Sequence, residues 1–196
     1  MGCDIHTYIE VYDDKKQKWI MAHGLRKSPY DNKLDVPYAD KFNDRDYDLF
    51  GILTDGVVRG KGYGFFAPKG LPSDASDFVR KSFTVDDHTP SYLTFQEIQD
   101  IKSIKVEISG MIEKIRLVKI KKLLKKDNYW IKSDLDELLY PYCGLTSMPG
   151  HVKFKIEVPI GYVIDDFLKY IKRAKDYQLG FSNSLDKIRI VFWFDN

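Results

Sequence analysis

The chain has 196 residues, a formal net charge of +2, and 43% hydrophobic and 14% aromatic residues. This apolar content excludes a disordered chain, and the length suffices for one domain with its own core. The small net charge does not indicate a nucleic-acid-binding protein. Two cysteines are too few for a disulfide framework, and the sequence contains neither a long apolar span nor the apolar core of a signal peptide. We therefore expect a cytoplasmic protein without a membrane partner.

The N-terminal residues alternate between two faces, as in a strand. Residues 3–12 carry mostly apolar side chains at odd positions and polar or aromatic ones at even positions. The polar turn "DDKKQ" and the apolar segment "KWIMA" then predict a returning strand, so residues 3–22 are expected to form a β-hairpin. Residues 24–44 are rich in glycine, proline and polar residues, and we expect a long loop there, which is usually functional or mobile.

Three capping signals predict the starts of short helices. Asp46 precedes the apolar stripe of "YDLFGIL", and Gly56 marks the end of that helix. Ser76 precedes a second helix in "DFVRKSF". Thr94 and Glu97 form a capping box, so a third helix is expected to begin at Thr94.

A basic segment follows the capping box. Apolar residues between 101 and 118 recur at spacings of three and four, which predicts a helical seam. Residues 111–126 contain seven Lys or Arg residues and one Glu. We expect residues 1–196 to form a single α+β domain in which 99–130 is an inserted basic helical appendage. Its lysines are either solvated or face an acidic partner.

The chain ends in the segment "DKIRIVFWFDN", whose apolar density predicts a strand buried in a sheet. Another strand is expected in "HVKFKIEVPI" and a helix in "DDFLKYIKRAKDYQLG". The predicted fold class is therefore α+β. It has a mostly antiparallel sheet that includes the N-terminal hairpin and the C-terminal strand, with helices packed on one side.

If the two terminal strands are neighbours, one face of the sheet carries a cluster of reactive side chains. Arginine grips anions through paired hydrogen bonds, aromatic rings stack on planar groups, and an Asp–His pair can transfer protons or hold a metal ion. A polar network that binds no ligand is the alternative. The cluster consists of Asp4, His6, Tyr8, Arg189, Trp193 and Asp195.

Two further segments bear on function. His88 in "DDHTPSYLT" is a candidate acid–base or ligand residue, with a plain surface turn as the alternative. The segment "KGYGF" matches the start of an RNA-binding motif, but Pro68 stands where that motif needs an aromatic residue. We therefore do not expect sequence-specific nucleic-acid binding. The sequence leaves open whether the chain self-associates.

Several motifs together resemble a family of small phage-encoded proteins that begin Met-Gly-Cys-Asp-Ile-His. The resemblance implies synthesis in the cytoplasm of an infected bacterium and directs attention to polar residues inside the shared motifs, such as Arg45 and Ser91. This chain has Asp44-Arg45-Asp46-Tyr47 where the family has Gly-Arg-Asn-Tyr. The motifs are "MGCDIH" at the start, "YDLF", "GLPSDAS", "HTPSYLT", and "RIVFWFDN" at the end.

The leading hypothesis is a phage accessory protein that binds a small phosphate-bearing or nucleotide-like ligand and counters a host defence signal. Three arginines are the expected phosphate contacts, and three aromatic residues are the expected stacking surfaces for a base. The expected ligand-binding residues are Tyr8, Arg45, Tyr47, Arg59, Ser91, Arg189, Trp193 and Asp195.

Two alternatives remain open. One is a hydrolase in which Asp4, His6 and His88 act as acid–base residues, with Asp4 and His6 holding one divalent metal ion. The other is an inhibitor that binds a host protein through the basic helix.

Overall fold

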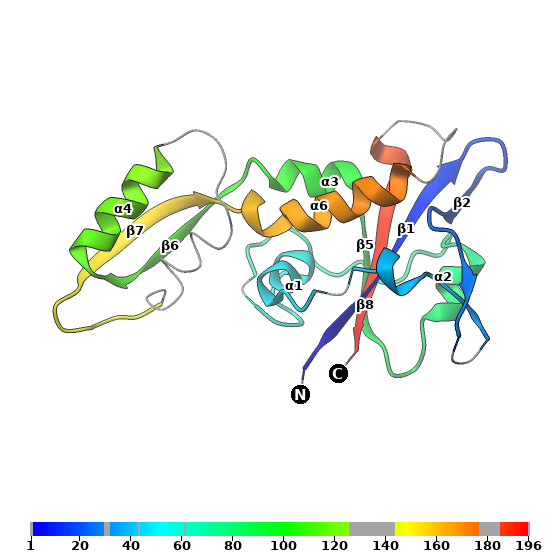
Figure 1. The fold of residues 1–196 in the computed structure, drawn as a ribbon, viewed down its shortest axis with the longest axis horizontal. Coiled ribbons are helices and arrows are strands. Elements are labelled where there is room, and N and C mark those ends of the chain that lie inside the picture. The colour runs from blue at the N-terminus through cyan, green and yellow to red at the C-terminus, as the bar shows by residue number, and fades with distance from the viewer. Residues whose placement is uncertain are drawn as a thin grey trace. The chain divides into compact units, whose positions relative to one another are not determined.

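The computed structural model describes residues 2–29, 32–42, 44–60, 62–125, 144–176 and 185–195. The chain forms two compact units (Figure 1). The sheet unit comprises Met1–Gln99 and Asp165–Asn196, and the central unit comprises Asp100–Ile164. The central unit is longer than the predicted insertion over 99–130, because it also contains a strand near residue 155. Within the described residues, no helix combines the length and apolar composition that crossing a membrane requires.

The sheet unit is built on a four-stranded antiparallel sheet with the order β2-β1-β8-β5. The strands are β1 (Asp4–Asp13), β2 (Lys18–Met21), β5 (His88–Thr94) and β8 (Ile188–Asp195). The predicted α+β class, the N-terminal hairpin and the C-terminal strand are therefore confirmed. The two terminal strands are direct neighbours, with Asp4 opposite Asp195 and Val11 opposite Ile188.

β2 pairs with only the second half of β1, from Glu10 to Asp13. Among the described residues, the first half of β1 therefore has a paired strand on one side only, which is β8. The segment that follows β2 forms a small hairpin of β3 (Arg26–Lys27) and β4 (Leu34–Asp35), and then the 3₁₀ helix η1 (Tyr38–Asp40). The predicted long loop thus contains short regular elements.

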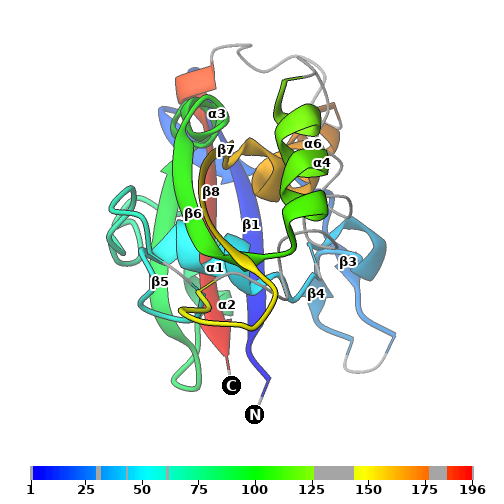
Figure 2. The same ribbon diagram turned by 90° about the vertical axis from the view of Figure 1, so that its left-hand side faces the viewer.

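One face of the sheet packs against helices α1 (Tyr47–Thr54) and α6 (Gly161–Asp176). Phe50 of α1 meets Phe194 at a ring-centroid distance of 5.0 Å, and Tyr170 of α6 reaches Thr7 of β1. Figure 2 looks onto the face that carries α1. The odd-numbered side chains of β1 point to this face, as the alternation of the sequence predicts.

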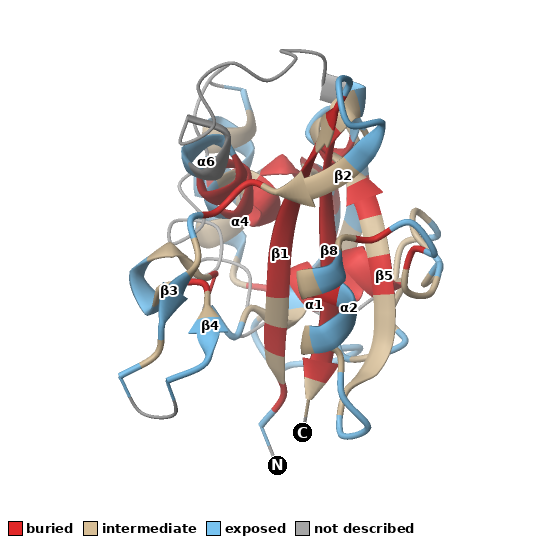
Figure 3. Ribbon diagram, turned by 90° about the vertical axis from the view of Figure 1, so that its right-hand side faces the viewer, coloured by how far each residue is buried: buried red, intermediate tan, exposed pale blue. Residues whose placement is uncertain are grey.

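The opposite face is covered as well, by helix α2 (Asp77–Ser82) and the residues that precede it. Ala75 and Val79 pack with Tyr8, Val191 and Trp193 in one apolar cluster. Helices therefore lie on both faces (Figure 3), and the expectation of helices on one side is wrong for α2. The physical reason is the apolar face of α2, which is buried in this cluster.

The predicted helix caps are confirmed. The Asp46 carboxylate accepts hydrogen bonds from the amides of Asp48 and Leu49 at the start of α1. Ser76 caps α2 in the same way. Thr94 and Glu97 exchange the reciprocal bonds of a capping box at the start of α3 (Phe95–Ile101). Each cap satisfies amides that have no partner within the helix.

In the central unit, the prediction of one continuous helix over residues 101–118 is wrong. Residues Lys105–Ile112 form strand β6, which pairs antiparallel with β7 (Val152–Pro159), and only Lys114–Leu124 form a helix, α4. The isoleucines of this segment fit a helical period, but Val106 and Ile108 also alternate with polar residues. Pairing with β7 decides between the two patterns, because a strand partner satisfies the backbone of β6 along its length.

Candidate functional site

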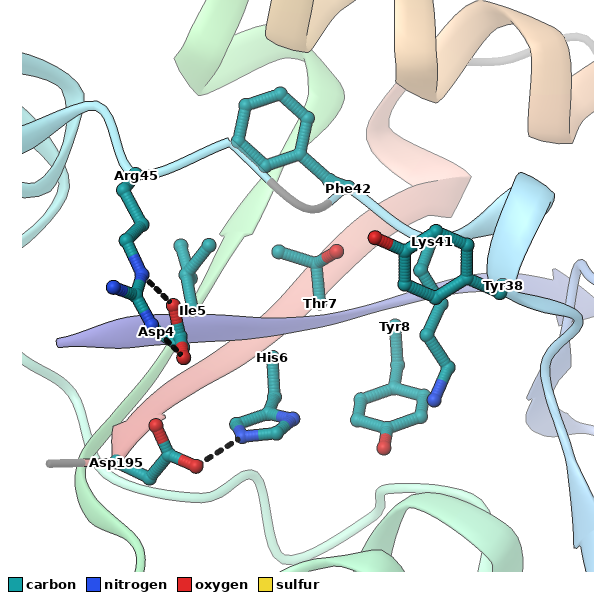
Figure 4. Close-up of a pocket in the computed structure, with 10 residues that line it drawn as sticks. All are labelled: Asp4, Ile5, His6, Thr7, Tyr8, Tyr38, Lys41, Phe42, Arg45 and Asp195. Carbon is teal, nitrogen blue, oxygen red and sulfur yellow. Dashed lines mark hydrogen bonds and ion pairs between the residues drawn. The ribbon is translucent and has the colours of Figure 1, made fainter. Parts of the chain in front are cut away.

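A cleft of about 420 Å³ runs along the first half of β1 (Figure 4). We call it the β1 cleft. Its second wall is the segment from η1 to the start of α1, which lies along the side of β1 that β2 leaves uncovered. Figure 4 shows His6 and Tyr8 pointing to one side of the strand and Ile5 and Thr7 to the other. The lining residues are Asp4, Ile5, His6, Thr7, Tyr8, Tyr38, Lys41, Phe42, Arg45 and Asp195.

Asp4 and Arg45 form a paired ion bridge at one end of the cleft. Nε of Arg45 donates to one carboxylate oxygen of Asp4, and Nη2 donates to the other over 2.7 Å. The guanidinium lowers the pKa of Asp4, and the carboxylate raises the pKa of Arg45. A guanidinium has five N–H donors, so this bridge orients Arg45 and leaves three donors for another acceptor. Gly2 allows the close approach, because a Cβ there would lie 2.6 Å from Nη1 of Arg45.

His6 and Asp195 form a second polar pair in the cleft. Nε2 of His6 lies 3.1 Å from Oδ2 of Asp195, and both side chains are more than one third exposed, at 36% and 39%. The His6 ring also stacks on Trp193 with a centroid distance of 6.2 Å. An aspartate that holds one ring nitrogen leaves the other nitrogen available to a ligand or a proton. This arrangement can support acid–base chemistry.

Three cleft residues come from the long loop and were not singled out by sequence reasoning: Tyr38, Lys41 and Phe42. Tyr38 is 79% exposed, which is unusual for a tyrosine. Lys41 extends its Nζ to within 2.6 Å of Asp35. The only sequence signal for these residues is the length of the loop itself, since their position opposite β1 depends on tertiary contacts.

Tyr8 and Trp193 are buried in the packing between the sheet and α2. Trp193 is 1% exposed and stacks on Tyr8 at 4.8 Å and edge-on with Phe83 at 5.4 Å. Burial raises the pKa of Tyr8 to about 12. The expected base-stacking surfaces are thus occupied by protein side chains, because α2 covers the face on which the sequence predicted an open site.

Arg189 lies outside the cleft, at the other end of β8. Its guanidinium is 4% exposed, contacts Glu10 at 2.8 Å and Asp74 at 2.7 Å, and lies over the Trp19 ring at 4.0 Å. Glu10 uses its second oxygen to accept a hydrogen bond from the amide of Ser76. Arg189 therefore ties β8, β1 and the start of α2 together, and its position does not match the expected phosphate contact.

His88 and Ser91 are separated from His6 by the sheet itself. His88 opposes Phe194 in the sheet and stacks on its ring, whereas His6 opposes Trp193. Adjacent residues of β8 point to opposite faces, so the two histidines lie on different sides. Ser91 is buried and accepts a hydrogen bond from the Lys69 amide. The expected set of Asp4, His6 and His88 is therefore not brought together.

Tyr47 and Arg59 contact each other, with the Arg59 guanidinium 5.2 Å from the centre of the Tyr47 ring. Neither residue lines the β1 cleft. The expected metal ligands Asp4 and His6 are engaged by Arg45 and Asp195. Within the described part of the chain, no three His, Cys, Asp or Glu side chains are grouped closely enough to hold a metal ion.

No family model matches this chain, and the comparison found no curated protein and no solved structure with significant similarity to it.

Proposed function

We propose that the protein binds a small phosphate-bearing or nucleotide-like ligand in the β1 cleft. The observation that supports this most directly is the geometry of Arg45, which Asp4 holds in place while three of its N–H donors remain for a ligand. Lys41, whose ammonium group is paired with Asp35, lines the same cleft. A planar guanidinium held in one orientation suits the paired hydrogen bonds that phosphate oxygens accept.

The other cleft residues suit the remainder of such a ligand. Tyr38 offers a highly exposed ring for stacking on a base, in place of the buried Trp193. His6, which is 36% exposed, supplies a hydrogen-bonding group along the strand. The cleft volume of about 420 Å³ lies within the range of ligand pockets, roughly 300–1,000 Å³.

Calorimetric titration with inorganic phosphate and a panel of nucleoside mono-, di- and triphosphates tests this proposal. We expect at least one nucleotide to bind and Arg45→Ala to weaken that binding about tenfold or more. Arg80→Ala is the matched control, because Arg80 forms an exposed ion pair with Asp77 and lies outside the cleft. Binding that Arg45→Ala leaves unchanged, or a panel without a single binder, would contradict the proposal.

The His6–Asp195 pair favours a second candidate, an acid–base hydrolase that acts on the same ligand. In this version Asp195 orients the imidazole, and His6 transfers a proton to or from the reacting group. His6→Gln then keeps ligand affinity but abolishes turnover, whereas a simple binder shows no turnover in either form. His88→Gln is the matched control, since His88 lies on the opposite face of the sheet.

In the phage setting that the sequence resemblance implies, we propose that ligand capture removes a host nucleotide signal. This biological use rests on analogy with that setting. An inhibitory role through the basic helix α4 is the alternative. Removing the charges of α4 by Lys→Gln substitutions should leave ligand binding in the β1 cleft intact and should abolish any binding of a host protein.

A further inference from the structure

The charges of the chain are divided unequally between its two units. Residues 100–164 contain 12 Lys or Arg residues and eight Asp or Glu residues, whereas the rest of the chain contains 19 and 21. The net charge of +2 is therefore the sum of a basic part of +4 and an acidic part of −2. Within the basic part, residues 114–125 contain six Lys or Arg residues and no Asp or Glu. These residues are helix α4 and its C-cap.

The packing of α4 leaves most of these charges in solvent. The helix contacts β7, and of the α4 residues, all of which the structure describes, only Ile120 is buried. Arg116 pairs with Glu113 over 3.4 Å. Each lysine of this segment is exposed, and none of them forms an ion pair with a described residue. The lysines are Lys114, Lys119, Lys121, Lys122 and Lys125.

Four of the five lysines lie on one side of the helix. An α-helix turns by about 100° per residue, so these four fall within about 100° of arc, on the side away from Ile120. They extend over 11 residues, which corresponds to roughly 16 Å along the helix axis. We call this row of side chains the α4 stripe, and it consists of Lys114, Lys121, Lys122 and Lys125.

A row of like charges suits a partner whose own charges repeat at short intervals. A nucleic-acid duplex presents one phosphate charge for about every 1.7 Å of its axis, so a stripe of this length meets several phosphates. A lysine ammonium group is a point charge that holds a phosphate without reading a base edge. Val118 lies within the stripe and is 47% exposed, but its side chain is shorter than the lysines around it.

The composition of α4 favours nucleic acid over an acidic protein. Protein interfaces are depleted in lysine and enriched in aromatic residues and arginine. Helix α4 has no aromatic residue, and its one arginine is paired with Glu113. The lack of an aromatic residue also favours a duplex over a single strand, because single strands are held largely by stacking of their bases on aromatic rings.

We propose that the α4 stripe binds the phosphate backbone of duplex nucleic acid without sequence specificity. Each ammonium group that contacts a phosphate releases a counterion, so the affinity depends steeply on salt concentration. The site lies within the central unit. It does not depend on the ligand that we propose for the β1 cleft.

Fluorescence anisotropy tests the proposal by titrating the full chain into a labelled DNA duplex of about 20 base pairs, at about 50 mM and about 200 mM NaCl. Four phosphate contacts should lower the affinity by roughly 150-fold between the two salt concentrations. Two duplexes of unrelated sequence should bind equally well. Absence of binding at the lower salt concentration, or a preference of more than about tenfold for one sequence, overturns the proposal.

A double variant locates the binding on α4. Lys121→Gln with Lys125→Gln removes two contacts and should reduce the salt-dependent loss of affinity to roughly 12-fold. Lys15→Gln with Lys81→Gln is the matched control, because it removes the same charge from exposed lysines outside the central unit. The control should behave as the parent chain. Equal effects of the two double variants would mean that net charge alone attracts the duplex, which contradicts the proposed site.

Competition separates nucleic acid from the other partners. Unlabelled duplex should displace the labelled duplex, and polyglutamate of the same total charge should do so much less effectively. Equal displacement by polyglutamate would identify an acidic protein as the partner and overturn the proposal. Arg45→Ala should bind the duplex like the parent chain, because Arg45 lies in the sheet unit. Loss of duplex binding in Arg45→Ala would place the contact at the β1 cleft and contradict a site on α4.

Discussion

Asp4 and Asp195 lie directly opposite each other across the β1–β8 pair, and each carboxylate has its own basic partner. Arg45 neutralises Asp4, and His6 contacts Asp195. Like charges at directly opposed strand positions are destabilising unless they are compensated. Arg45 therefore relieves this repulsion, and the two pairs orient the arginine and the imidazole that line the β1 cleft.

Removal of the Arg45 charge should make the protein less stable at neutral pH but not at low pH. Arg45 lowers the pKa of Asp4 below its ordinary value of 3.8, so the stabilisation is present above that value and is lost as the pH falls through the folded-state pKa. Because the pair is solvent-exposed, we expect Arg45→Met to lower the Tm by only about 1–2 °C at pH 7. Thermal unfolding at pH 7 and at about pH 2, where both the folded and the unfolded chain carry a protonated Asp4, checks this. An equal loss at both pH values would show that the side chain acts through packing.

Arg189→Met should destabilise the protein strongly, because Glu10 is fully buried and would lose its cation. Breaking a buried ion pair from one side costs about 3–5 kcal/mol in the free energy of unfolding. Urea denaturation measures this difference. The double variant Glu10→Gln with Arg189→Met is the control, and it should recover a large part of the loss because no charge remains buried without a partner. A single variant that costs under about 1 kcal/mol would contradict the structural role of Arg189.

Tyr8 should make stability fall at alkaline pH. Burial raises its pKa from 10.0 to about 12, so the neutral ring stabilises the fold below pH 10 and that contribution declines as the unfolded chain ionises above pH 10. At pH 11 the loss from this residue is about 1 kcal/mol. Unfolding free energies at pH 9 and pH 11 should therefore differ less in Tyr8→Phe than in the parent. An identical difference in both proteins would argue against the raised pKa.

Gly60 and Gly64 form a matched pair of backbone positions. Both have positive φ, at 79° and 75°, but a Cβ at Gly60 would overlap the carbonyl oxygen of Tyr47, whereas the space beside Gly64 is open. We expect Gly64→Ala to cost about 1 kcal/mol from backbone conformation and Gly60→Ala to cost a further 1–3 kcal/mol, approximately, from the steric conflict. Chemical denaturation of the two variants checks the difference. Equal losses would mean that the loop relaxes away from α1.

Much of the fold could be predicted because the signals are local. The side chains of Asp46, Ser76 and Thr94 cap helices by accepting hydrogen bonds from amides a few residues away. The local sequence around each cap therefore contains both the acceptor and the donors. The strict alternation near the N-terminus determines which side chains of β1 share a face. The apolar density of β8 predicts a strand buried on both sides, as observed.

Other features depend on contacts between distant parts of the chain. Ile108 fits a helix or a strand equally well, and its pairing with Ile156 of β7 determines the strand. The sequence predicted Asp4, His6 and Asp195 on one face, but the face of His88 depends on its position opposite Phe194. Tyr38, Lys41 and Phe42 line the cleft because the loop that carries them lies along β1, which the local sequence does not determine.

The sequence by itself therefore determined the two terminal strands, the caps of α1, α2 and α3, and the face of each terminal-strand side chain. The tertiary structure decided which faces α2 and α6 bury, that Arg189 and Trp193 are enclosed, and that Arg45 and Lys41 line the same cleft. The physical reason is the distance along the chain over which each interaction acts. Hydrogen bonds of caps and the pleat of a strand act within a few residues, whereas burial and ion pairing depend on which distant segments come into contact.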